Sequence, residues 1–334
     1  MGAALPELAA RISGGAGLTA AGTLADRVAG CVLGLALGDA LGAPFEFRRA
    51  DDVPDPLPAF ELPWKGFPPG TTTDDTAMAR NLVRSLVERR GFDPADVAAR
   101  HVAWFRTGPP DVGAQTRRVL ARVAAGERAE DAARAEWEAR GPEVSAGNGS
   151  VMYCAPLGAA YAHRPNALID AAPRLSAVTH HDERCRTAVL AVTLATAAAV
   201  RGEPPGSAAA EALRAVLDRE GGEELEFLAE EAGRARRVDG PDMGFCLFTA
   251  GLGLQTLARA GSWRQIGPAG VEAELRRLVL LGGDTDTNAA VAGALLGAAV
   301  GHSGLPPGWL GRLVDRDAIE REARGLVPLA ERTE

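Results

Sequence analysis

Two stretches of the chain, far apart in the sequence, combine aspartates with threonines just before an apolar helical pattern. They are Thr71-Thr72-Thr73-Asp74-Asp75-Thr76 and Gly282-Gly283-Asp284-Thr285-Asp286-Thr287. Either stretch alone is typical of a helix cap, because a Thr or Asp oxygen accepts hydrogen bonds from the free N–H groups of the first turn. Capping needs one oxygen per helix, whereas these stretches together supply four carboxylates. We therefore expect a metal site where the two helices begin.

The ligand types at this expected site favour a hard cation. The two stretches offer oxygen atoms without histidine or cysteine, which suits Mg²⁺ or Mn²⁺ better than zinc, with Ca²⁺ a weaker fit. Two cations shared by paired carboxylates would offset the repulsion between the carboxylates. Gly282 and Gly283 allow a sharp backbone turn, so that Asp284 and Asp286 can point at one centre.

Three other loops that each lead into a helix have the composition of anion sites. They are the Gly- and Pro-rich residues 108–115, the Ser-Ala-Gly-Asn-Gly-Ser stretch at 145–150, and Thr-His-His-Asp at 179–182. Backbone N–H groups at a helix N-terminus bind anions readily where no Cβ obstructs them. Each loop alone is more simply a turn or a cap. Beside a metal site, the three together indicate a diphosphate ligand.

The segment around residues 34–46 carries two further features. Gly34, Gly38 and Gly42 are spaced by four, which places them on one helix face and predicts close packing against another helix. Glu46 follows Pro44 in an apolar context, where burial would raise its pKa and suit it to donating a proton. The alternative for Glu46 is an exposed loop glutamate.

The elements that must position these residues are helical. Apolar residues recur at helical spacing, alanine-rich runs span residues 187–200, 208–217, 243–260 and 288–300, and an apolar run at 151–161 also indicates a helix. Strand signals are nearly absent. We expect residues 24–334 to form a single all-α domain, a compact orthogonal multi-helix bundle with a binuclear metal centre. The Ala- and Gly-rich residues 1–23 are expected to be a flexible tail.

Composition narrows the class of partner. The chain is 46% hydrophobic and 24% charged, with a formal net charge of −8, which argues against a nucleic-acid backbone as the main ligand. The four cysteines are scattered rather than paired, as expected for buried thiols in a reducing cytoplasm. We find neither a secretory signal pattern nor an uninterrupted apolar run long enough to span a membrane.

With these residues in view, the chain resembles the ADP-ribosylglycohydrolase family, which includes the dinitrogenase reductase-activating glycohydrolase and the vertebrate ADP-ribosylhydrolases. The matching stretches run in family order: residues 30–46, 72–78, 108–113, 147–152, 179–180 and 282–290. The Gly-Gly-Asp-Thr-Asp-Thr-Asn-Ala-Ala stretch at 282–290 is the most specific match. The sequence departs from the family pattern at Tyr153, where arginine is usual, and at Glu183, where proline is usual.

The resemblance implies an all-α fold that holds two Mg²⁺ ions, or Mn²⁺. The metal ligands would be Thr73, Asp74, Asp75, Asp284, Asp286 and Thr287. The diphosphate would be held by Asp111, Val112, Gly113, Ala114, Ser145, Gly147, Asn148, Gly149, Ser150 and His180. Asp75 would take a proton from the attacking water, while Glu46 would lie near the ribose and assist proton transfer or gating.

We therefore expect a cytoplasmic, metal-dependent hydrolase that cleaves the N- or O-glycosidic bond between ADP-ribose and a modified protein side chain or other acceptor. A monomer is favoured, no membrane partner is expected, and nucleic acid would enter only as a modified substrate. Two alternatives stay open. One is a family member that binds ADP-ribose or a nucleotide without cleaving it, and the other is a metal-dependent phosphohydrolase acting on a nucleotide diphosphate.

Overall fold

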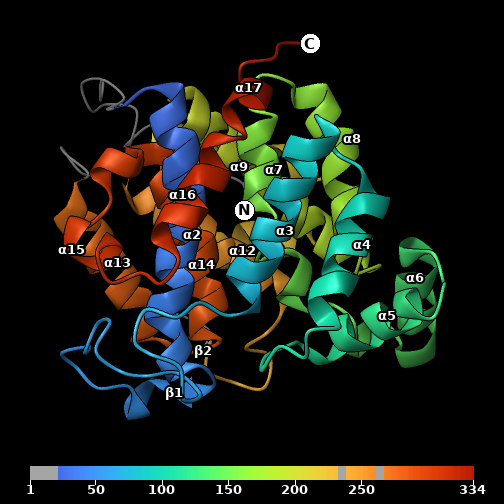
Figure 1. Cartoon of the computed structure of the whole chain (residues 1–334), viewed down its shortest axis with the longest axis horizontal. Helices are drawn as coiled ribbons and strands as arrows, with labels where there is room; N and C mark the ends of the chain where they lie inside the picture. The colour runs from blue at the N-terminus through green and yellow to red at the C-terminus, as the bar shows by residue number, and fades with distance from the viewer. Residues whose placement is uncertain (1–21, 232–237, 261–266) are drawn as a thin grey trace.

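The computed structural model describes residues 22–231, 238–260 and 267–334, and over these residues the fold is a bundle of α-helices with one short two-stranded ribbon (Figure 1). The α-helices are α2 (Leu24–Gly42), α3 (Asp74–Arg89), α4 (Pro94–Phe105), α5 (Ala114–Ala124), α6 (Ala129–Arg140), α7 (Ala155–Ala160), α8 (Pro165–Ser176), α9 (Glu183–Arg201), α10 (Pro205–Val216), α11 (Gly222–Glu231), α12 (Cys246–Ala260), α13 (Pro268–Val279), α14 (Thr285–Val300), α15 (Pro307–Leu310), α16 (Arg316–Arg324) and α17 (Val327–Ala330). The strands are β1 (Arg48–Arg49) and β2 (Gly282–Gly283), and the 3-10 helices are η1 (Ala43–Phe45), η2 (Ala50–Asp52), η3 (Pro142–Val144), η4 (Asn148–Ser150) and η5 (His302–Gly304). The all-α prediction is confirmed, whereas the binuclear centre stays a prediction.

The antiparallel pair α2 and α14 forms the centre of the bundle, and both helices are buried along nearly their whole length. A Cβ on Gly34 would overlap the carbonyl oxygen of Gly293, and a Cβ on Gly38 would overlap that of Ala289. The two backbones therefore touch, as the spacing of the glycines predicts. This contact brings the end of α2, at Gly42, against Asp286 at the start of α14.

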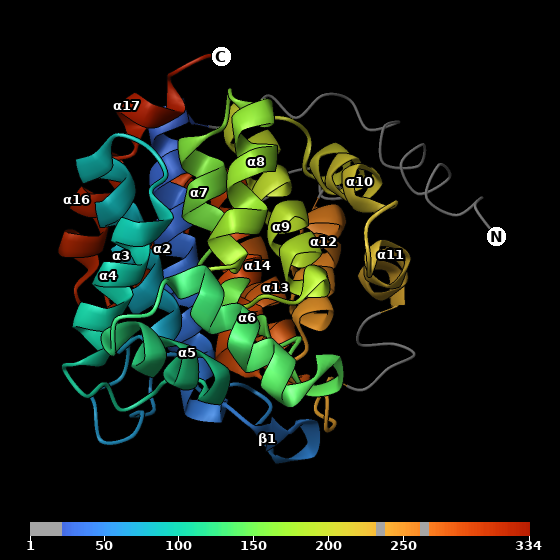
Figure 2. The same cartoon turned by 90° about the vertical axis from the view of Figure 1, so that its right-hand side faces the viewer.

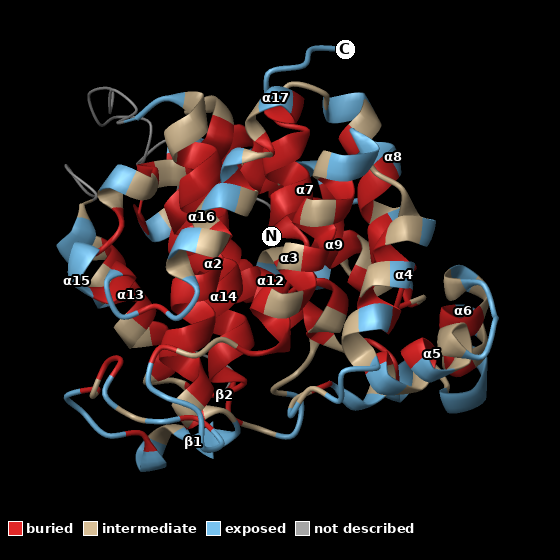
Figure 3. Cartoon of the chain, in the orientation of Figure 1, coloured by how far each residue is buried: buried red, intermediate tan, exposed pale blue. Residues whose placement is uncertain are grey.

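The other helices pack around this pair in layers. α9 and α12 cover α14 on one side, while α3 lies beside α2 on the other and α4 packs against α3 (Figure 2). Buried residues fill the central helices, and exposed residues gather on the outer turns and on the loops near β1 and β2 (Figure 3). α5 and α6 lie at the periphery, where Val119, Ala132 and Ala133 form a small separate core.

Several predicted helix boundaries need correction. The helix expected at 151–161 is the short α7, because η4 leads into a turn in which the N–H groups of Val151 and Met152 both bond to the carbonyl of Asn148. α7 begins only at Ala155, with Pro156 in its first turn. The helix expected from residue 243 begins at Cys246, and α9 is longer than predicted because Asp182 caps it.

Only part of the N-terminal tail expected at residues 1–23 lies within the described residues. Residues 1–21 of the expected tail lie outside the described residues. Thr23 belongs to the fold, since its hydroxyl accepts the N–H of Asp26 at 3.2 Å and caps α2. Within the described ranges, one helical segment, Leu24–Phe45, is long and apolar enough to cross a membrane, and its most apolar part is 94% buried inside the bundle.

Candidate active site

The two acidic stretches meet where α3 and α14 begin. The hydroxyl of Thr287 donates to Oδ2 of Asp75 at 3.3 Å, and the hydroxyl of Thr73 lies 3.4 Å from the same oxygen. Thr73 is also the N-cap of α3, because its Oγ1 accepts the N–H of Asp75. The start of α3 is therefore both capped and part of a cluster of acidic side chains. This cluster contains more carboxylates than the helix caps use.

Asp39 of α2 holds the first turn of α3 in place through hydrogen bonds. Its carboxylate accepts the N–H of Thr73 at 3.0 Å and the N–H of Thr76 at 3.1 Å, and it accepts the Thr76 hydroxyl at 2.5 Å. Asp39 is fully buried. These bonds fix the turn that carries Asp74 and Asp75, so Asp39 positions two of the predicted metal ligands without lining the cleft.

The glycine turn before α14 brings a third element to the site. Gly282 and Gly283 both have positive φ, and as β2 they pair with Arg49 and Arg48 of β1. The N–H of Phe47 bonds to the carbonyl of Gly283 at 2.8 Å, which ties the segment after α2 to the start of α14. Glu46 is thereby held beside Asp286.

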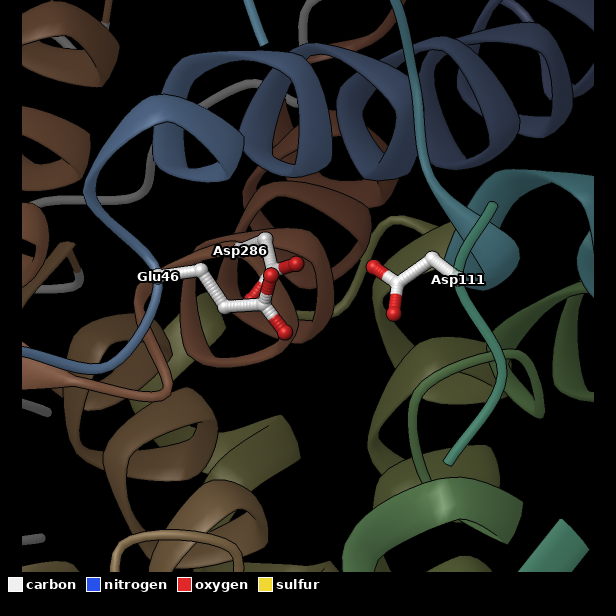
Figure 4. A group of neighbouring side chains, drawn as sticks. All are labelled: Glu46, Asp111 and Asp286. Atoms are coloured by element: carbon white, nitrogen blue, oxygen red, sulfur yellow. The ribbon is translucent and has the colours of Figure 1, made fainter. Parts of the chain in front are cut away.

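Glu46 and Asp286 face Asp111 across the cleft (Figure 4). One carboxylate oxygen from each of these three residues lies within 4.8 Å of the others. Asp111 comes from the loop before α5, which the resemblance assigned to the diphosphate. The structure places it at the acidic side of the site.

The carboxylates of this cluster have strongly perturbed pKa values. Burial, reinforced by Asp111, raises the pKa of Glu46 to about 8, while Lys65 opposes the shift. Burial and neighbouring aspartates raise the pKa of Asp74 to about 7 and hold those of Asp75 and Asp286 well above the usual range. Oδ1 of Asp75 is buried without a hydrogen-bond partner. An oxygen-rich cluster with an unpaired buried carboxylate oxygen fits divalent cations, which would neutralise it.

Among the described residues, Lys65 is the positively charged side chain that contacts this cluster. Its ammonium lies 3.2 Å from Asp111 and 3.5 Å from Glu46, and it also sits over the ring of Trp64. The loop that carries Lys65 therefore contacts the acidic cluster.

The cluster forms one end of a cleft of about 530 Å³, a size that suits a nucleotide-like ligand. The predicted site residues that line it are Glu46, Asp74, Asp111, Val112, Gly113, Ala114, Gly147, Asn148, Gly149, His180, Asp284, Asp286 and Thr287. The cleft is also lined by Phe47, Gln115, Thr116, Arg118, Arg140, Val144 and Met152, which the sequence analysis did not assign.

The wall of the cleft beside this cluster has the character of an anion site. α5 begins there at Ala114 without a side-chain cap, so the N–H groups of its first turn are open to a ligand. The N–H of Gly113 itself bonds to Asp74 at 3.4 Å. Arg118 and Arg140 also line this wall, and Arg118 forms an ion pair with Glu136. The cleft therefore combines clustered carboxylates with an adjoining wall of hydrogen-bond donors.

Four predicted site residues lie behind the cleft wall. Thr73 and Asp75 are buried beneath the acidic end. The hydroxyl of Ser145 donates to the carbonyl of Gly141 at 2.6 Å, and that of Ser150 pairs with Ser176 at 3.0 Å. Both serines therefore support the loop at 145–150, and their side chains are occupied within the protein.

Asn148 lines the cleft and also orients a predicted metal ligand. Its side-chain amide donates to Oδ2 of Asp284 at 2.8 Å and to the hydroxyl of Thr249 at 3.0 Å. Thr249 in turn donates to Asn288 at 2.8 Å. This buried chain links the loop at 145–150 to α12 and α14, and so fixes that wall of the cleft relative to the carboxylates.

Sequence reasoning missed Asp39, Lys65 and Thr249 as parts of this site. Asp39 carried a usable signal, because a lone aspartate interrupts an otherwise apolar helix at residues 35–41, and a buried charge requires partners. Lys65 and Thr249 carried no comparable local signal, since their roles depend on contacts between distant segments.

Clustered carboxylates in a cleft, next to hydrogen-bond donors, are groups that a glycoside hydrolase uses. The family model of ADP-ribosylglycohydrolase matches residues 20–334. The chain therefore belongs to the ADP-ribosylglycohydrolase family, which confirms the resemblance and the prediction that it is a hydrolase of this family.

Relatives and a solved structure agree with this assignment. The chain is 29% identical to the ADP-ribosyl-[dinitrogen reductase] glycohydrolase of Rhodospirillum rubrum, over 91% of this chain and 97% of that protein. It is 28% identical to the ADP-ribosylarginine hydrolase Tri1 of Pseudomonas putida, over 90% and 78% of the two chains. A solved ADP-ribosylglycohydrolase-related protein complex superposes with a TM-score of 0.75 at 34% identity, over 92% of this chain and 99% of that chain.

Proposed function

We propose that this protein removes ADP-ribose from a modified acceptor by hydrolysing the glycosidic bond at the distal ribose, with the help of two Mg²⁺ or Mn²⁺ ions. The observation that carries the proposal is that one cleft joins clustered carboxylates to an adjoining wall of hydrogen-bond donors. ADP-ribose has a diphosphate in its middle and a hydroxyl-rich ribose at one end. The donor wall at α5 and His180 matches the diphosphate, while the carboxylates at α3 and α14 match a ribose held through cations.

The proposed cation ligands are Thr73, Asp74, Asp75, Asp284, Asp286 and Thr287. When bound, the ions would neutralise the carboxylates and polarise the ribose hydroxyls or a water molecule. The unpaired Oδ1 of Asp75 and the contact between Thr287 and Asp75 support this set, because they bring an oxygen atom from each helix start together and leave a buried carboxylate oxygen available.

Glu46 is the proposed proton donor to the leaving group. It lines the cleft beside Asp286, where burial raises its pKa to about 8 in the ion-free protein, and a raised pKa suits a proton donor. Asp75 is the proposed acceptor of the proton from the attacking water. Because Asp75 lies behind the cleft wall, that water must lie between its carboxylate and the sugar. The carboxylates around the ribose also stabilise the positive charge that develops at the anomeric carbon.

The nature of the acceptor is tested by product analysis. The protein is incubated with arginine-, serine- and phosphate-linked ADP-ribose substrates, with Mg²⁺ and with chelator, and the products are separated. We expect intact ADP-ribose from at least one substrate, in the presence of Mg²⁺ only. Asp286→Asn is the inactive comparison, and Asp51→Asn, an exposed position on η2, is the matched control.

Other products would redirect the assignment. Release of AMP would indicate a phosphohydrolase in place of a glycohydrolase. Tight binding of ADP-ribose without release from any substrate would indicate a binding protein.

The four cysteines are buried and free, which supports the proposed cytoplasmic location.

A further inference from the structure

Lys65 is the chain's only lysine, and a tight turn fixes its backbone. The N–H of Trp64 bonds to the carbonyl of Phe67 at 3.1 Å, and the N–H of Phe67 bonds back to the carbonyl of Trp64 at 2.7 Å. The two residues between them, Lys65 and Gly66, both have positive φ, as a two-residue turn of this kind requires. Positive φ is uncommon for a lysine and is found more often at functional sites. The turn therefore presents an ammonium group where a glycine or asparagine would fit the backbone better.

The side chain of Lys65 is also directed. Its ammonium lies 4.8 Å from the centre of the Trp64 ring, and that ring is buried and packs against Phe67 at a centroid distance of 5.8 Å. From this support the ammonium reaches to 3.2 Å from Asp111 and 3.5 Å from Glu46. The positive charge is therefore held at these two carboxylates, although the Lys65 side chain is 42% exposed.

The position of this charge matters because both carboxylates line the cleft. Under the proposed function, on which this inference rests, Glu46 gives its proton to the leaving group. The acceptor must then depart next to Glu46, and the Lys65 ammonium lies within a few ångströms of that place. A charge so near the leaving group acts differently on acceptors of different charge.

An acceptor linked through oxygen suits this arrangement. The attacking water forms a bond to the anomeric carbon and passes its proton to Asp75, while the bond from that carbon to the acceptor oxygen breaks. The oxygen keeps the electron pair of the broken bond and takes the proton from Glu46. The ammonium of Lys65 stabilises the negative charge that develops on the departing oxygen.

An acceptor linked through arginine does not suit it. The guanidinium of such a substrate is already a cation, so it leaves as a neutral guanidine and needs no proton from Glu46. Glu46 and Asp111 are the carboxylates with which a guanidinium would pair here, and Lys65 already pairs with both. The like charge of Lys65 also repels the guanidinium.

We propose that Lys65 determines acceptor specificity, so that the protein favours ADP-ribose linked through oxygen, as to a serine hydroxyl or a phosphate, over ADP-ribose linked to the guanidinium of arginine.

The first test compares kcat/KM for serine-linked and arginine-linked ADP-ribose at saturating Mg²⁺. We expect the wild type to favour the serine-linked substrate. In Lys65→Met, the ratio should move about fivefold toward the arginine-linked substrate, the size expected for one charge in a partly exposed site. Lys65→Arg should keep the wild-type ratio because it keeps the charge, and Lys65→Glu should move the ratio further than Lys65→Met. A folding defect lowers both rates together and leaves their ratio unchanged.

The control for this test is Arg128→Met. It removes one positive charge from a side chain that is 82% exposed and does not line the cleft. We expect its ratio to equal that of the wild type.

The second test needs no turnover. Reductive methylation with ¹³C-formaldehyde labels Lys65 and the N-terminal amine alone, because the chain has no other lysine, and it keeps the positive charge. Lys65→Met identifies the lysine signal. We expect this NMR signal to shift when ADP-ribose is added in the presence of Mg²⁺, and to shift much less with ADP, which lacks the distal ribose.

The outcomes separate this inference from the proposed function. A ratio that Lys65→Met leaves unchanged, or a wild type that favours the arginine-linked substrate, would overturn the role of Lys65 and leave the glycohydrolase intact. A lysine signal that stays in place while calorimetry shows ADP-ribose bound would do the same. Release of ADP-ribose from none of the substrates would overturn both.

Discussion

The hydroxyl of Thr287 lies 3.3 Å from the carboxylate of Asp75, although the two residues are 212 positions apart in the sequence. This contact joins the starts of α3 and α14 into one site. It depends on the close packing of α2 against α14, which fixes where α14 begins relative to α2. It also depends on Asp39, which attaches the start of α3 to α2 through hydrogen bonds. The site is therefore a product of backbone packing as much as of its acidic side chains.

Asp39→Asn tests the anchor of α3. The amide would present a donor where Asp39 now accepts N–H groups from Thr73 and Thr76. We expect a loss of about 2 kcal/mol in the free energy of unfolding and weaker Mg²⁺ binding, because Asp74 and Asp75 lose their fixed position. Urea denaturation and calorimetric Mg²⁺ titration measure the two effects, with Asp51→Asn as control. Mg²⁺ affinity that stays at the wild-type value would count against the anchoring role.

Gly38→Ala tests the contact between α2 and α14. The added Cβ would overlap the Ala289 carbonyl, which the rigid backbone of α14 cannot move away without opening the bundle. We expect a loss of about 3 kcal/mol in the free energy of unfolding, measured by chemical denaturation. Gly308→Ala is the matched control, since a Cβ there meets nothing within 4 Å. Equal stability of the two variants would contradict the close packing of the two helices.

The sequence allowed the helical class and the two acidic stretches to be predicted, because both depend on local patterns. Helical spacing marks α2, α9, α12 and α14, and the spacing of Gly34, Gly38 and Gly42 marks the contact face of α2. The Gly-Gly turn before Asp284 was also recognisable, since positive φ is readily adopted by glycine.

Other features of the site depend on long-range packing that no local pattern encodes. The start of α7 was misplaced, because the bonds from Val151 and Met152 to Asn148 favour a turn over a continuous helix. Ser145 and Ser150 resemble anion-binding residues in sequence, yet their hydroxyls bond to Gly141 and Ser176. The helices packed behind a loop therefore determine which of its residues face the ligand.

His101 tests how burial affects stability at low pH. It is fully buried beside Tyr153, and burial lowers its pKa from 6.5 to about 3. Between these values the unfolded chain binds a proton that the folded chain does not, so the free energy of unfolding falls as the pH falls through this window. The contribution is at most about 1.4 kcal/mol per pH unit, and it is fully present above pH 6.5.

The measurement is urea denaturation of the wild type and His101→Gln between pH 4 and pH 7. We expect the variant to show a shallower dependence on pH, because Gln cannot be protonated. Some slope should persist, since His180 titrates in the same direction. Identical slopes for the two proteins would show that His101 does not resist protonation in the folded state.

Lys65→Met tests the positive charge that pairs with the acidic cluster. The ammonium pairs with Glu46 and Asp111 and opposes the approach of a second cation. We expect the variant to bind Mg²⁺ a few-fold more tightly, a modest change because Lys65 is partly exposed and its charge is screened. Arg49→Met, which removes an exposed positive charge from β1, is the control of equal net charge. Weaker Mg²⁺ binding by Lys65→Met would mean that Lys65 organises the cation site.

The most direct test of the central claim is the release of free ADP-ribose from an ADP-ribosylated substrate by the wild type, followed with Mg²⁺ and again after chelation. We expect release with Mg²⁺ that stops on chelation and is restored by adding the metal back, with Asp286→Asn inactive in both conditions. Release that is unaffected by chelation, or that persists at the wild-type rate in Asp286→Asn, would contradict a cation-assisted hydrolase built on the starts of α3 and α14.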